Sequence, residues 1–138
     1  MTELVREIFG GEPVWFGQNR MDFLAEIASE EAVRSFEPSF EKIRALGNRG
    51  LIVTARTSSA DYDFVSRFFA PGFGVDEDPV TGSAHCCLAP YWAERLGRPS
   101  LRGYQASGRG GHVGVEVAGD RVKLRGRAIT TLSGTLEI

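Results

Sequence analysis

Residues 83–96, SAHCCLAPYWAERL, are apolar on nearly every side of a helix. A helix on a protein surface carries one apolar stripe, whereas a helix that is apolar all round is buried. Thr81 or Ser83 is expected to cap its start, and Gly97 is expected to end it. We therefore predict a core helix that is surrounded by the rest of the fold.

Segments with the pattern of β-strands precede and follow this helix in the sequence. The run LIVTA, residues 51–55, is rich in β-branched side chains and predicts a buried strand with residues 61–70 as its partner. Further strands are predicted at residues 14–16, 21–28, 101–107, 112–117, 121–125 and 128–138. Glycine-containing turns separate the last four segments, which predicts a meander of hairpins.

Short helices are predicted near the N-terminus. Their expected starts are Thr2, Ser29 and Ser39, which are residue types that cap helices. Together these elements predict the fold class α+β. Residues 1–138 are expected to form a single domain in which a strongly curved, barrel-like sheet wraps round the central apolar helix.

Composition narrows the function classes. The 138 residues are 42% hydrophobic and carry 16 basic and 18 acidic side chains, a net charge of -2, so no nucleic-acid partner is expected. No apolar run reaches the about 18 to 20 residues of a membrane span, and the N-terminus does not resemble a signal peptide. We expect a cytoplasmic protein with no membrane partner.

The loop before the central helix carries acidic residues in a pattern that suggests a binding or catalytic site. Residues 74–83, GVDEDPVTGS, place three carboxylates directly before a helix start. The amides of residues 82–84, with the hydroxyls of Thr81 and Ser83, would seat a carboxylate ligand, and a neighbouring acid could move protons. The alternative is that Asp78 or Ser83 only caps the helix and the other carboxylates are solvated.

Other chemistry-bearing residues have simpler interpretations. His85 is expected to pack as a neutral side chain against the sheet. Cys86 and Cys87 are adjacent, which disfavours a disulfide between them, and they lack a second pair at metal spacing, so no metal site is expected. Residues 108–111, GRGG, predict a hairpin turn more than a phosphate loop, although Arg109 could reach an anionic ligand.

Longer motifs carry a family resemblance. The strings RFFAP (67–71), GVDEDPVTGSAH (74–85), LAPYW (88–92) and QASGRGG (105–111) resemble the phenazine-biosynthesis-like (PhzF-like) isomerase family. The resemblance covers essentially the whole chain but only the second, C-terminal half of the family's usual length.

This resemblance implies a diaminopimelate-epimerase-like fold. Such a fold has two similar halves, each a barrel-like sheet around a central helix, with the active site between them. It also implies catalysis without a cofactor, with Asp78 as the acid of the second half, Ser83 as a substrate-binding residue, and Thr81 and Gly82 in binding roles. Arg109 is added as a residue that contacts an anionic substrate. The family's catalytic glutamate belongs to the first half and matches no position of residues 1–138.

The expected function is therefore that of an isomerase or epimerase that moves a proton on a small carboxylate or amino-acid-like substrate. It would act as a homodimer or with a separate chain that supplies the first half, and residues 128–138 would pair across the interface. Two alternatives stay open. The chain could be a non-catalytic module that binds small acids, or an inactive half that lacks the glutamate.

Overall fold

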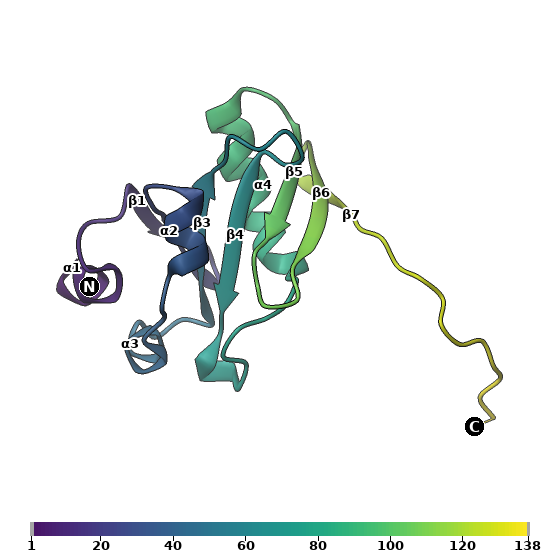
Figure 1. The fold of residues 1–138 in the computed structure, drawn as a ribbon, viewed down its shortest axis with the longest axis horizontal. Coiled ribbons are helices and arrows are strands. Elements are labelled where there is room, and N and C mark those ends of the chain that lie inside the picture. The colour runs from purple at the N-terminus through teal and green to yellow at the C-terminus, as the bar shows by residue number, and fades with distance from the viewer. Residues whose placement is uncertain (1, 138) are drawn as a thin grey trace.

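The computed structural model describes residues 2–137. Its helices are α1 (Thr2–Phe9), α2 (Glu30–Ser35), α3 (Phe40–Ala45) and α4 (Gly82–Leu96), with a short 3-10 helix, η1 (Pro71–Phe73). Its strands are β1 (Trp15–Gln18), β2 (Asp22–Glu26), β3 (Gly50–Arg56), β4 (Phe64–Phe69), β5 (Ser100–Gln105), β6 (Gly111–Ala118) and β7 (Arg121–Arg125). Figure 1 shows the strands as one sheet with the helices on its two faces.

The strands lie in the sheet in the order in which they follow along the chain, from β1 to β7. β2 is parallel to β3 and β4 is parallel to β5, whereas the other neighbours are antiparallel. Parallel neighbours need a crossover connection. α2 and α3 form the first crossover, and η1 with α4 forms the second. The second crossover places the loop before α4 at the end of β4.

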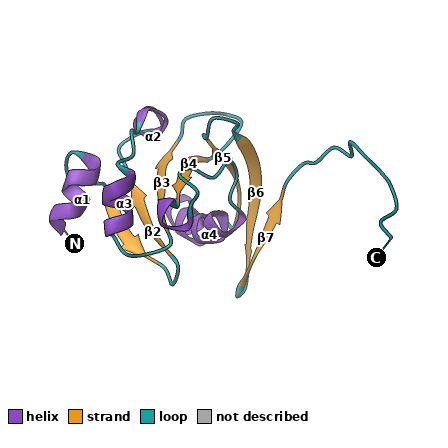
Figure 2. Cartoon of the chain, turned by 90° about the horizontal axis from the view of Figure 1, so that it is seen from below, coloured by secondary structure: helices purple, strands orange, loops and turns teal. Residues whose placement is uncertain are grey.

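Alternate residues of the central strands enter two separate cores. In β3, Leu51 and Val53 join the core that contains residues of α1, α2 and α3, whereas Ile52 joins the core that contains α4. This alternation follows from the two-residue period of a strand, and both faces are apolar because both are covered. Figure 2 shows the sheet curving around α4 without closing. The predicted α+β class and curved sheet are confirmed.

α4 is buried on one side only. Ala84, His85, Leu88, Ala89 and Trp92 are buried on the side that faces the sheet. Cys86, Pro90 and Glu94, which follow one another at four-residue steps, are exposed on the other side. The prediction that the helix is surrounded is therefore wrong for residues 2–137. The apolar character of Cys86 and Pro90 indicated burial, but no described segment covers this strip.

The predicted helix starts at Ser29 and Ser39 are confirmed. The Ser29 hydroxyl accepts a hydrogen bond from the Ala32 amide at 3.1 Å, and the Ser39 hydroxyl accepts one from the Lys42 amide. Gly97 ends α4 with a φ of 68°, a left-handed conformation that suits glycine. None of the helices within residues 2–137 is long and apolar enough to span a membrane.

The predicted strand at residues 128–138 is wrong over its described part. Residues 126–137 belong to no helix or strand and run away from the sheet, as Figure 1 shows, and Ile138 lies outside the described residues. Ile129, Leu132 and Leu136 are 89%, 88% and 84% exposed. A strand needs a neighbouring strand for its backbone hydrogen bonds, and this segment has none within the described chain.

Candidate functional site

The loop that carries the acidic residues is tied to the end of β4. The Asp78 amide donates a hydrogen bond to the Phe68 carbonyl at 3.0 Å, and Asp78 itself is half-buried. Four residues later the chain enters α4. The geometry therefore holds Asp78 beside the start of α4, as the sequence predicted.

Gln105, the last residue of β5, braces this loop from inside. Its side chain is fully buried. Its Nε2 donates to the Asp78 carbonyl at 2.6 Å and to the Thr81 hydroxyl at 3.1 Å, and its Oε1 accepts from the Thr81 amide at 2.8 Å. A single side chain thus sets the distance between the acidic residue and the helix start.

Gln105→Met is expected to destabilise the protein by about 1–3 kcal/mol, because the volume is kept while the Asp78 and Thr81 groups lose their buried partner. Urea unfolding measures this change. The matched control is Gln18→Met, since Gln18 is exposed at the end of β1. Equal stabilities of the two variants would contradict the bracing role.

The start of α4 has no side-chain cap. Thr81 occupies the N-cap position, but its hydroxyl makes no capping hydrogen bond and instead donates to the Asp78 carboxylate. The first helical bond runs from the His85 amide to the Thr81 carbonyl. The amides of residues 82–84 therefore have no protein partner among residues 2–137, and they present the positive end of a helix. Neither Asp78 nor Ser83 caps α4, so the capping alternative is wrong.

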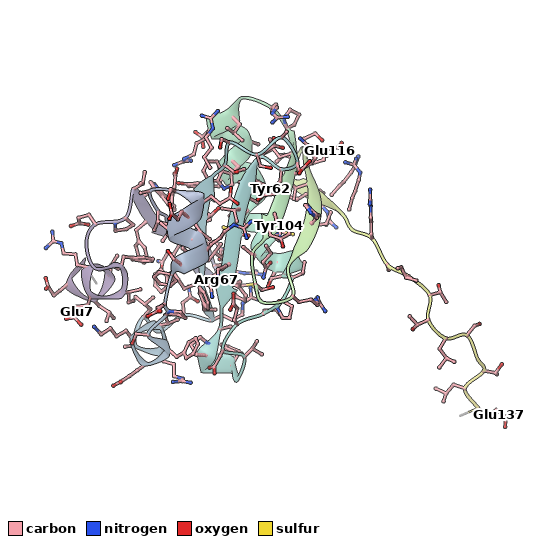
Figure 3. The ribbon with its side chains drawn as sticks, in the orientation of Figure 1. Glu7, Tyr62, Arg67, Tyr104, Glu116 and Glu137 are labelled. Carbon is pink, nitrogen blue, oxygen red and sulfur yellow. The ribbon has the colours of Figure 1, made fainter. Side chains whose placement is uncertain are left out.

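The other two carboxylates of the loop are engaged elsewhere. Glu77 accepts two hydrogen bonds from Arg67, at 2.7 and 3.0 Å. Figure 3 shows the side chains of Arg67 on β4 and Tyr104 on β5. Asp76 lies 3.8 Å from the Arg44 guanidinium and both side chains are more than half exposed. Only Asp78 of the three is held at the helix start.

Ser83 contacts a residue that the sequence did not indicate. Its hydroxyl accepts a hydrogen bond from Arg49 Nη2 at 2.8 Å. The same guanidinium binds Asp22, which is 1% exposed. Asp22 is the first residue of β2 and Arg49 directly precedes β3. These neighbouring strands are parallel, so the sheet brings both residues to the helix start.

Of the other residues predicted for the site, Arg109 shares a groove with Gly82 but not with Asp78, Thr81 or Ser83. It lines an open groove of about 1040 Å³ together with Gly82, Leu124 and three further arginines. Within residues 2–137 it makes no hydrogen bond or ion pair with Asp78 or Ser83. The GRGG segment joins β5 to β6, and Gly110 has a φ of 72°, so the predicted hairpin turn is confirmed.

Comparison with known proteins agrees with these features. The family model for phenazine biosynthesis-like proteins (PhzC-PhzF) matches residues 7–134. The chain belongs to this family. The resemblance carried by the sequence motifs is confirmed.

Curated and solved relatives match the chain over part of their own length. An uncharacterized isomerase of Halalkalibacterium halodurans is 48% identical over 127 residues, which are 92% of this chain and 48% of the relative. One from Pseudomonas aeruginosa is 52% identical over 115 residues, 83% of this chain and 43% of the relative. A crystal structure of a PhzC/PhzF protein from Clostridium difficile is 37% identical, with a TM-score of 0.86 over 100% of this chain and 52% of that one. This chain therefore spans about half the length of the curated relatives.

In this phenazine biosynthesis-like chain, His85 is a structural residue, as predicted. It is fully buried, and its Nδ1 lies 2.8 Å from the Thr81 carbonyl. A carbonyl only accepts, so Nδ1 carries a proton. Nε2 has no partner among the described residues. Burial lowers the pKa of His85 below its ordinary value of 6.5, against the smaller opposing effect of the hydrogen bond to Thr81.

This burial predicts a loss of stability in acid. Below about pH 6.5 His85 binds a proton in the unfolded chain but not in the folded chain, whose pKa is lower. The free energy of unfolding therefore falls as the pH falls, by at most about 1.4 kcal/mol per pH unit. His85→Gln keeps a donor for the Thr81 carbonyl and does not titrate. Urea unfolding at about pH 7 and pH 5 should show a smaller acid loss in this variant. Identical pH profiles would contradict the prediction.

The two cysteines are free. Cys86 is exposed and Cys87 is half-buried, and burial raises the pKa of the Cys87 thiol. A raised pKa keeps the thiol protonated, which disfavours a nucleophile. The described residues contain no group of three or more His, Cys, Asp or Glu that could hold a metal ion.

Proposed function

We propose that this chain carries one half of the active site of a cofactor-independent isomerase or epimerase, which moves a proton on a small carboxylate or amino-acid-like substrate. The observation that carries the proposal is the uncapped start of α4 beside a held carboxylate. Directly after Thr81, whose hydroxyl binds Asp78, lie amides that have no partner in the described part of the chain. Two similar proteins, from Halalkalibacterium halodurans and Pseudomonas aeruginosa, are named isomerases.

The proposed chemistry uses each group for one task. The substrate carboxylate binds to the amides of Gly82 and Ser83 and to the Ser83 hydroxyl, where the helix dipole favours negative charge. Asp78 takes the proton from the neighbouring carbon, and the bonding electron pair moves into the substrate's carboxyl group, where the same amides stabilise it. The electron pair then returns to carbon and forms the C–H bond of the product with a proton that the protonated Asp78 delivers, which leaves Asp78 as it began. Thr81 holds the Asp78 carboxylate in place. Arg109 contacts an anionic part of the substrate that extends into the groove.

The proposed site also needs a second protein chain that covers it. The exposed strip of α4 formed by Cys86, Pro90 and Glu94 lies next to Ser83, and the chain spans about half of its curated relatives. We infer that the fold is one half of a diaminopimelate-epimerase-like molecule, with the sheet wrapped round α4. A second copy of this chain or a separate chain equivalent to the first half would cover the strip and close the cleft.

The C-terminal segment suits such a partner. Leu132 and Leu136 lie on one side of an extended chain, whereas Ser133, Thr135 and Glu137 lie on the other. Pairing of this segment with a strand of the partner would bury the exposed leucines. Light scattering across a concentration range tests the homodimer: a mass near twice 15.1 kDa supports it. A monomer at every concentration contradicts it and leaves the separate chain as the partner.

The reaction is tested by isotope exchange. The assembled protein is incubated in D₂O with small carboxylates and amino acids, and deuterium at the carbon next to the carboxylate is measured by mass spectrometry. Incorporation supports proton transfer. Ligands that bind at Gly82 and Ser83 without any incorporation would favour the small-acid-binding module instead.

A further inference from the structure

Arg49 joins three separate elements at the start of α4. It directly precedes β3, and its Nη2 donates to Ser83 Oγ at 2.8 Å. Its Nε donates to Asp22 Oδ1 at 2.8 Å, and its guanidinium lies 5.5 Å from the centre of the Phe68 ring. A single cation therefore lies between β2 and the exposed Ser83 hydroxyl.

The position of Arg49 is set by a buried charge. Asp22 is 1% exposed, and Asn19 Oδ1 accepts from the amides of Met21 and Asp22 at 2.7 and 2.8 Å, which shapes the turn before β2. The hydrogen bonds that Arg49 donates to Asp22 raise the pKa of Arg49, so the guanidinium stays charged. Movement of Arg49 would leave a buried carboxylate unpaired, which is strongly unfavourable. Arg49 is thus held in one orientation.

We propose that Arg49 is a positioning residue that makes this site selective for an anionic group over a neutral one of the same shape. This inference rests on the proposed function, because it assumes that the ligand's carboxylate binds at Ser83. A guanidinium can only donate, so Arg49 occupies a lone pair of Ser83 Oγ and directs the hydroxyl proton outward as a donor. Arg49, and not its partner Asp22, contacts Ser83, so the ion pair presents its positive end at the helix start.

The same contact assigns Ser83 to binding rather than to attack. A nucleophilic serine needs a neighbouring base that takes its proton. Arg49 cannot accept a proton, and no imidazole or carboxylate among the described residues accepts a hydrogen bond from Ser83 Oγ. Ser83 therefore serves as a hydrogen-bond donor to the ligand.

The test compares benzoate with benzamide, which share a shape and differ in charge. Binding is followed by the NMR signals of the Gly82, Ser83 and Ala84 amides. The main variant is the double change Asp22→Asn with Arg49→Gln, which removes both charges and leaves no buried ion unpaired. Arg49→Lys keeps the positive charge but cannot make the bidentate hydrogen bonds to the Asp22 carboxylate. Arg121→Gln is the matched control, because Arg121 is an exposed arginine at the β6–β7 turn.

We expect benzoate, and not benzamide, to shift these amide signals in the unchanged protein. The double variant should bind benzoate about 10-fold or more weakly, Arg49→Lys should lose less, and the control should be unchanged. Equal benzoate affinity in the double variant, with the same amides responding, would overturn the role of Arg49 and leave the carboxylate site intact. No response to benzoate in the unchanged protein would overturn the carboxylate site itself, and the role of Arg49 with it.

Discussion

Asp78→Asn is expected to lower the rate of proton exchange by about 10²- to 10⁴-fold, the usual contribution of a general acid or base. Asparagine keeps the size of the side chain and still accepts a hydrogen bond from Thr81, but it cannot take up a proton at neutral pH. The measurement is the rate of deuterium incorporation into the substrate by the assembled protein. Ligand affinity should change much less than this rate, because the amides of α4 remain.

Asp76→Asn is the matched control for this experiment. Asp76 lies two residues before Asp78 in the same loop, but its carboxylate is exposed and lies near Arg44. We expect exchange at the unchanged rate in this variant. Two results would contradict the role of Asp78: an undiminished rate in Asp78→Asn, or an equal loss in both variants.

Trp92→Ala is expected to destabilise the fold by about 3–5 kcal/mol, the usual cost of removing a buried tryptophan. Trp92 is 1% exposed, and its ring stacks on Phe64 with centres 6.0 Å apart. Its Nε1 donates to the Thr54 hydroxyl at 3.0 Å, and that hydroxyl donates to the Val65 carbonyl at 2.7 Å. The substitution therefore opens a cavity between α4 and the sheet and removes the hydrogen bond that fixes α4 to β3.

Urea unfolding measures this loss, and two variants calibrate it. Trp92→Phe keeps most of the volume and loses the hydrogen bond, so a loss smaller than that of Trp92→Ala is expected. Trp15→Ala removes a tryptophan that is 39% exposed on β1, and it should cost clearly less. A cost for Trp92→Ala no greater than for Trp15→Ala would show that α4 is not anchored through Trp92.

Much of the fold followed from local patterns. Ser29 and Ser39 mark helix starts through their own hydroxyls, and residues 51–55 form a buried strand because β-branched side chains suit a sheet covered on both faces. The burial of α4 was overestimated, because an apolar sequence does not say whether a covering segment is present. The strand at residues 128–138 failed for the same reason, since its pattern needs a neighbour that residues 2–137 do not supply.

The candidate site also has one part that the sequence predicts and one part that it does not. Residues 78–83 are close in sequence, and a helix start directly after an acidic loop places a carboxylate beside free amides in almost any fold. Arg49 lies 34 residues from Ser83 and 27 from Asp22, and Gln105 lies 27 residues from Asp78. These contacts depend on the register of the sheet. Asp22 and Gln105 are buried in the structure, but burial of a polar residue is not visible in a sequence, so nothing in the sequence pointed to these contacts.

The sequence by itself therefore determined the family, the α+β class and the position of the Asp78–Ser83 loop at the start of α4, because motifs, caps and strand periods are local properties of the chain. Only the tertiary structure decided that Thr81 binds Asp78 instead of capping the helix, that Gln105 braces the loop, and that Arg49 reaches Ser83. The physical reason is that side-chain hydrogen bonds join whichever groups the sheet brings within about 3 Å, however far apart they lie along the chain.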